Sequence, residues 1–103
     1  MSVMVEFSFF PIDKGESLSE YVSRSLKVVD ESGLKYNFGP MGTALEGSYD
    51  ECMKVVKKCY ERMADDCRRV YGTIKIDYRA DREDGLQQKI ESIENRLGKE
   101  LKK

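Results

Sequence analysis

The segment Arg69–Arg79, RVYGTIKIDYR, alternates two sets of side chains and predicts a long β-strand. One face of this strand would hold Val70, Gly72, Ile74, Ile76 and Tyr78, and the other Tyr71, Thr73, Lys75, Asp77 and Arg79. Residues 2–10, SVMVEFSFF, alternate in the same way and predict a second strand. Pro11 has no N–H to donate, so we expect strand pairing to end there.

Helix signals lie between these two strands. Ser17-x-x-Glu20 and Ser48-x-x-Glu51 each match the capping box, in which side chains satisfy the N–H groups at a helix start. They predict helices over residues 17 to about 32 and 48 to about 66. A last helix is expected to begin near Asp84-Gly85, because apolar residues then recur at steps of four and three.

Two shorter strands complete the pattern, at residues 34–38 and 41–47 on either side of the Gly39-Pro40 turn. The order is therefore βαββαβ plus a terminal helix. Two interleaved βαβ halves predict an α+β fold, the ferredoxin-like sandwich with a four-stranded antiparallel sheet. Right-handed crossovers would place the first two helices on one sheet face. Residues 1–103 contain no linker or low-complexity stretch, so we predict a single domain.

The composition restricts the classes of partner. Lys and Arg number 18 against 19 Asp and Glu, so the basic excess typical of nucleic-acid binders is absent. No signal-peptide pattern opens the chain and no apolar stretch approaches the ~20 residues that span a bilayer. These features predict a cytoplasmic protein with no membrane or nucleic-acid partner. Cys52, Cys59 and Cys67 fit no disulfide or zinc spacing and are expected to be reduced, packed thiols, with no metal bound.

The strand face opposite the two helices mixes large apolar and charged residues. Met4 and Phe10 share it with Glu6 and Ser8 on the first strand, and Lys75, Asp77 and Arg79 lie on the last. Such a face usually marks an interface or a ligand surface, so we expect it to pack against another subunit. Two roles remain open for its polar groups: a salt-bridged interface, with Glu6–Lys75 as a natural pair, or a ligand site. The last helix covering this face within its own chain is the alternative.

Catalysis is not expected. The chain contains no histidine, which removes the base of a serine hydrolase or a thiol protease. Lys75 with Asp77 would be the best pair for an enzyme, but no nucleophile, base and orienting group can be assembled around them. We therefore predict no catalytic residues.

Two motifs resemble those of a known family. Met41–Gly47, MGTALEG, is similar to the GT-x-hydrophobic-EG signature of the small thiamine-binding-like proteins, the UPF0045 or DUF77 family, which is related to the YkoF thiamin/hydroxymethylpyrimidine-binding proteins. Thr73–Asp81, TIKIDYRAD, resembles the second signature, TIKIDDRRD, with Tyr78 in place of the second Asp. The resemblance covers nearly the whole chain in order and spacing.

The resemblance implies a ferredoxin-like fold that assembles as a dimer of dimers and binds a small molecule without a cofactor. It implies that thiamine or its hydroxymethylpyrimidine moiety is the ligand, contacted by Thr43, Glu46, Lys75, Asp77 and Arg79. Glu46 or Glu6 would suit the thiazolium cation, and Phe10, Tyr36 or Tyr71 an aromatic face beside it. The alternative function is an oligomeric structural or regulatory interaction protein that binds no small molecule.

Overall fold

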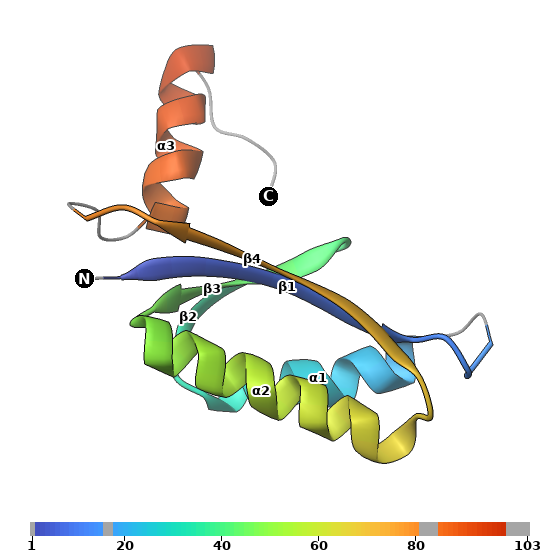
Figure 1. Ribbon diagram of the computed structural model, residues 1–103. Helices are drawn as coiled ribbons and strands as arrows, with labels where there is room; N and C mark the ends of the chain where they lie inside the picture. Colours follow the sequence, from blue (N-terminus) through green and yellow to red (C-terminus); the bar gives the residue numbers. More distant parts are fainter. Residues whose placement is uncertain (1, 16–17, 81–84, 99–103) are drawn as a thin grey trace.

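The computed structural model describes residues 2–15, 18–80 and 85–98, with backbone alone for 85–89. Its elements are β1 (Val3–Pro11), α1 (Ser19–Glu31), β2 (Lys35–Gly39), β3 (Gly42–Gly47), α2 (Tyr49–Asp66), β4 (Val70–Tyr78) and α3 (Gly85–Leu97). The four strands form one antiparallel sheet in the order β2-β3-β1-β4. This is the predicted ferredoxin-like arrangement, in which the first and last strands are neighbours. Figure 1 shows α1 and α2 together on one face of the sheet, also as predicted.

The inner face of the sheet, which packs on α1 and α2, forms the core. Apolar residues of α2 recur at helical spacing and turn one stripe inward. The buried cluster comprises Val3, Val5 and Phe7 of β1, Leu45 of β3, Val29 of α1, and Cys52, Val55, Val56 and Cys59 of α2. The helices lie mainly over the two central strands, β1 and β3, so the core is centred there.

The outer face is the opposite side of the sheet. It consists of Met4, Glu6, Ser8 and Phe10 of β1 with their register neighbours Ala44, Glu46, Tyr71, Thr73, Lys75 and Asp77. In Figure 1, α3 rises from this side, and it contacts β1. Met4 and Glu46 are buried at that end of the face, whereas Glu6, Tyr71 and Lys75 are exposed. The last helix therefore leaves much of the outer face uncovered.

Pairing continues past Pro11, contrary to the sequence-based expectation. Pro11 lies opposite Val70, and the next residue, Ile12, donates its N–H to the Arg69 carbonyl at 3.0 Å. Because bonded pairs alternate in an antiparallel ladder, the nitrogen of Pro11 is turned away from β4. It faces the β3 side, where pairing has already ended at Phe7. A proline costs no hydrogen bond at such a position.

The two helix starts differ. Ser48 and Glu51 form the complete predicted capping box of α2. Helix α1, however, begins at Ser19 with Leu18 as N-cap and no side-chain capping bond, later than predicted. Ser17, on which the predicted box depends, lies outside the described residues. In the described part of the chain, no helix combines the length and apolarity needed to span a membrane.

Candidate functional site

A cavity of about 340 Å³ lies between α1 and the end of the sheet where the β2–β3 hairpin turns. Its apolar lining comes from Phe7, Phe9, Phe10, Leu18, Val22, Leu26, Val29, Phe38, Pro40 and Met41. Three residues with hydroxyl groups also border it, Ser8, Ser25 and Thr43. Small-molecule sites typically have about 300–1,000 Å³ and combine apolar walls with a few polar groups. The cavity thus fits one small organic molecule.

The backbone of β1 supplies further polar groups beside this cavity. Since the Ile12 N–H donates to Arg69, even-numbered residues of β1 turn their peptide groups toward β4 and odd-numbered ones toward β3. The β1–β3 register ends at the pair Phe7–Thr43. The N–H and C=O of Phe9 therefore point past the end of β3, toward the hairpin turn that borders the cavity. They present one donor and one acceptor close together.

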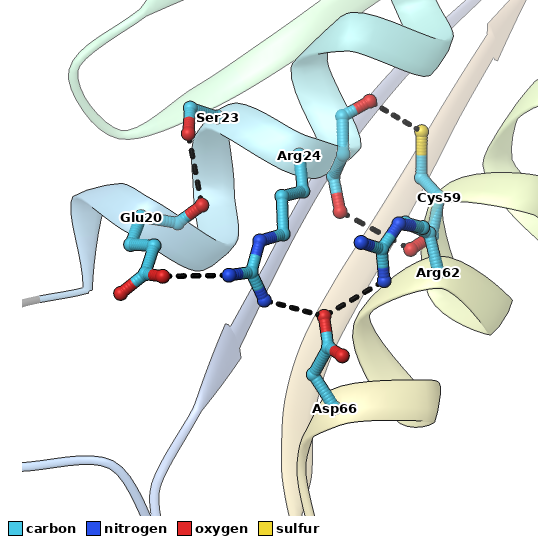
Figure 2. A network of polar contacts seen from close by, with 7 residues as sticks. Glu20, Ser23, Arg24, Cys59, Arg62 and Asp66 are labelled. Atoms are coloured by element: carbon cyan, nitrogen blue, oxygen red, sulfur yellow. Dashed lines mark hydrogen bonds and ion pairs between the residues drawn. The ribbon is translucent and has the colours of Figure 1, made fainter.

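Two sets of contacts hold α1, one wall of the cavity, against α2 (Figure 2). The Ser25 hydroxyl donates to the Cys59 carbonyl at 3.2 Å, and the Cys59 thiol donates to the Ser25 carbonyl at 3.4 Å. Nearer the surface, Arg24 and Arg62 each donate to the Asp66 carboxylate at 2.7 Å. The hydrogen bond from Arg24, and then that from Arg62, hold the pKa of Asp66 below its usual value. These contacts position the wall, and of the residues that make them only Ser25 lines the cavity.

The outer face brings together several of the predicted site residues. Glu6 is paired with Lys75 in the register, and Lys75 Nζ lies 3.8 Å from Glu6 Oε1, which confirms the expected ion pair. Their side chains are 54% and 77% exposed, so the pair contributes ~1 kcal/mol or less. Ser8 lies opposite Thr73 and Asp77 opposite Met4 on the same face. Arg79 directly follows the last residue of β4.

Glu46 and Thr43 occupy opposite faces, because an odd offset along a strand reverses the side-chain direction. Glu46 is 5% exposed on the outer face and accepts a hydrogen bond from Ser2 at 3.4 Å. Thr43 is 7% exposed, lies opposite Phe7 on the inner face and borders the cavity. The seven predicted site residues therefore do not form one cluster: Thr43 is separated from the outer-face set.

The three aromatic residues expected to lie beside the ligand are also divided between the outer and inner faces of the sheet. Phe10 and Tyr71 pack together on the outer face with ring centroids 5.5 Å apart. Tyr36 is in register with Leu45 on the inner face, and its hydroxyl donates to Asp30. Sequence reasoning missed Phe9 and Phe38 as wall residues of a cavity. The available signal was Phe38 next to the Gly39–Gly42 turn, which brings an aromatic ring to the hairpin end.

Cysteine and acidic side chains do not form a metal centre in the described ranges, where no group of three or more potential ligands comes together. Cys52 and Cys59 are buried among apolar side chains, as predicted for packed thiols, and Cys67 is partly exposed. Burial raises the pKa of Cys52 to about 11 and that of Cys59 to about 12. Both thiols therefore stay protonated at neutral pH.

The architecture and the cavity define a class of protein, a small ferredoxin-like α+β domain with room for one small molecule. The chain belongs to the thiamine-binding protein family, whose model matches residues 5–94. The UPF0045 protein of Methanocaldococcus jannaschii is 37% identical over 91 residues, which cover 88% of this chain and 91% of that protein. A UPF0045 protein of Mycobacterium bovis is 38% identical over 98 residues, covering 94% and 96%.

Solved structures agree with this assignment. The crystal structure of the M. jannaschii protein superposes with a TM-score of 0.84, covering 89% of this chain and 95% of that one. A DUF77 domain of unknown function from Bacillus cereus has 32% identity and a TM-score of 0.78, with coverage of 87% and 88%. A Thermotoga maritima protein named for a proposed role in thiamine biosynthesis or salvage has 26% identity and a TM-score of 0.80, with coverage of 90% and 99%.

Proposed function

We propose that this protein binds thiamine or its hydroxymethylpyrimidine moiety in the cavity between α1 and the β2–β3 turn. The observation that carries the proposal is the ligand-sized, largely apolar cavity, which is bordered by four phenylalanines and by Thr43, a residue of the first signature motif. Membership of the thiamine-binding protein family and similarity to the T. maritima protein support the choice of ligand.

The chemistry of the cavity favours the pyrimidine half of thiamine. An aminopyrimidine is flat and uncharged at neutral pH and offers donors and acceptors on its ring edge. Aromatic walls suit its faces, while the Thr43 hydroxyl and the Phe9 peptide groups suit its edge. None of the described lining residues is a carboxylate, so nothing there would compensate a buried cation.

The thiazolium half would therefore remain outside the cavity. Gly42 borders the cavity, and a Cβ atom added to it would lie 3.4 Å from Glu6 Cγ. The Glu6 side chain thus lies beside Gly42 on the outer face of the sheet, where its carboxylate would attract a thiazolium cation that extends past Gly42. In this arrangement Glu6, and not Glu46, serves the cation, because Glu46 lies at the other end of β3.

Calorimetric titration of the purified protein tests this proposal with three compounds: hydroxymethylpyrimidine, thiamine and hydroxyethylthiazole. We expect both pyrimidine compounds to bind and the thiazole to give no heat. Thiamine should lose more affinity than hydroxymethylpyrimidine in Glu6→Gln. No heat with either pyrimidine at millimolar concentration would remove the proposal.

We further propose that the role is non-catalytic, as a cytoplasmic carrier, buffer or sensor. Lysines that act as bases or Schiff-base amines are buried, whereas the Lys75 side chain is 77% exposed and paired with Glu6. Prolonged incubation with thiamine should therefore return the compound unchanged by chromatography. Any protein-dependent product would show an enzyme instead.

The second candidate function is an oligomeric interaction protein that binds no small molecule. It is favoured by the exposed apolar residues of β4, which resemble an uncovered contact surface. If the outer-face charges served only assembly, Glu46→Ala and Lys75→Ala would weaken self-association and leave every ligand titration unchanged.

A further inference from the structure

The cavity between α1 and the β2–β3 turn reaches through the plane of the sheet to the outer face. Its lining includes Phe7 and Phe9, which lie on the inner face of β1, and also Ser8 and Phe10, which lie on the outer face. Both faces contribute because the pairing of β1 with β3 ends at Phe7, whereas β1 itself continues to Pro11. A molecule held in the cavity can therefore extend past the end of β3 and onto the outer face.

Gly42 of β3, Glu6 of β1 and Lys75 of β4 follow one another across the outer face beside this opening. A Cβ atom added to Gly42 would lie 3.4 Å from Glu6 Cγ and 3.6 Å from Cδ, so the Glu6 carboxyl group lies directly beside the glycine. Lys75 is in register with Glu6 on the other side of β1, with Nζ 3.8 Å from Oε1. Neighbouring strands are ~4.8 Å apart, so a ligand that leaves the cavity meets first the carboxylate and then the ammonium group.

The ammonium group of Lys75 changes which ligand this carboxylate serves best. Both side chains of the pair are more than half exposed, so the ion pair is weak and opens at little cost. When the thiazolium cation of thiamine lies beside Glu6, one carboxylate faces two cations, and Lys75 repels the ligand. A ligand with an anionic group beyond its thiazolium ring removes this imbalance, because each cation then has an anionic neighbour.

We propose that the site takes thiamine monophosphate in preference to thiamine, and that Lys75 binds its phosphate group. The inference rests on the proposed function, which places the pyrimidine in the cavity and the thiazolium beside Glu6. The hydroxyethyl arm of the thiazolium ring carries the phosphate in this ester. One strand spacing, ~4.8 Å, separates the positions of Glu6 and Lys75, and the arm can bridge that distance. Lys75 thus determines specificity, since it distinguishes the phosphorylated ligand from the free one.

Calorimetric titration with hydroxymethylpyrimidine, thiamine and thiamine monophosphate tests the preference. At low ionic strength we expect the phosphate ester to bind about fivefold more tightly than thiamine, which is the most that an exposed ion pair typically contributes. Because the contact is exposed, high salt should largely remove the difference. Equal or weaker binding of the phosphate ester at low ionic strength would overturn the proposal.

Substitutions of Lys75 test whether this residue causes the preference. Lys75→Gln should abolish it and Lys75→Glu should reverse it, while hydroxymethylpyrimidine keeps its affinity because it does not reach the outer face. Lys57→Gln is the matched control, since Lys57 is exposed on α2, in the helix layer on the opposite side of the sheet. A preference that persists in Lys75→Gln, or that Lys57→Gln abolishes equally, would contradict the assignment.

The titration with hydroxymethylpyrimidine separates this inference from the proposed function. If hydroxymethylpyrimidine and thiamine bind but the phosphate ester has no advantage, the role of Lys75 is refuted and the cavity remains the ligand site. If none of the three compounds gives heat at millimolar concentration, the cavity proposal fails and the preference fails with it.

Discussion

Ser25 of α1 and Cys59 of α2 hold each other by two reciprocal hydrogen bonds across the buried helix–helix contact. The Ser25 hydroxyl reaches the Cys59 carbonyl, and the Cys59 thiol reaches the Ser25 carbonyl. Both residues are buried, so the loss of one partner would leave the other polar group poorly solvated. The pair connects the wall of the cavity to the core of the domain.

Removal of the Ser25 hydroxyl should therefore destabilise the fold. We expect Ser25→Ala to lower the free energy of unfolding by about 1 kcal/mol in urea titrations. Ser23→Ala is the control, because the Ser23 hydroxyl bonds to Glu20 at the exposed surface of the same helix. Equal effects of the two substitutions would show that the buried bond adds nothing.

Thiol labelling should distinguish the cysteines. Burial raises the pKa of Cys59 to about 12 and that of Cys52 to about 11, while Cys67 is partly exposed. In the native protein at about pH 8, we expect a thiol reagent to modify Cys67 alone, and slowly, since partial burial and then Asp13 raise its pKa. All three thiols should react in denaturant. Rapid native labelling of Cys59 would mean that α2 opens readily.

Asp66 should make the folding stability of the protein depend on pH. Its pKa in the folded chain lies below the ordinary value of 3.8, chiefly because of the hydrogen bond from Arg24. Its contribution is therefore fully present above about pH 4 and is lost as the pH falls through the lowered folded pKa. Asp66→Asn should lower the melting temperature at neutral pH, and the difference from the unmodified chain should vanish in strong acid.

Asp65→Asn provides the comparison for that experiment, because Asp65 is exposed and adjacent on the same helix. It should change the melting temperature little at either pH. A pH-independent deficit in Asp66→Asn would assign the effect to packing and not to charge.

Gly72 should resist substitution because the Phe9 ring lies directly over it. A Cβ atom at this position would overlap two ring carbons of Phe9, which packs against Phe7 and Tyr60. Gly72→Ala should cost about 1–3 kcal/mol of folding free energy, since the ring must move. The double variant Gly72→Ala with Phe9→Leu should lose less than the sum of the single losses. Strict additivity would exclude the overlap as the cause.

Substitution of Thr43 tests whether its hydroxyl contributes to ligand binding in the cavity. Thr43→Val keeps the shape and removes the hydroxyl, so affinity for hydroxymethylpyrimidine should fall about tenfold. Thr73→Val is the matched control, because Thr73 lies on the outer face and does not line the cavity. Unchanged affinity in Thr43→Val would remove this hydroxyl from the proposed contact.

Period-two alternation, two capping-box motifs and the helical spacing of apolar residues sufficed to predict most of the fold. The Glu6–Lys75 pair followed from the strand order, because neighbouring strands place facing residues together. The start of α1 and the pairing of Pro11 could not be predicted from local signals. Whether a proline interrupts a ladder depends on which side its nitrogen faces, which the strand register sets, and on whether a neighbouring strand still pairs on that side.

The amino-acid sequence alone determined the order of the elements and the face on which each strand residue lies, because both follow from local periodicity and turn chemistry. Only the tertiary structure decided that Thr43 borders a cavity while Glu46 lies on the other side of the sheet, near the opposite end of β3. It also decided that Ile74 and Ile76 are left exposed. Both outcomes depend on which strands the helices cover and on how far β1 extends beyond β3. Neither of these relationships is encoded in a local sequence pattern.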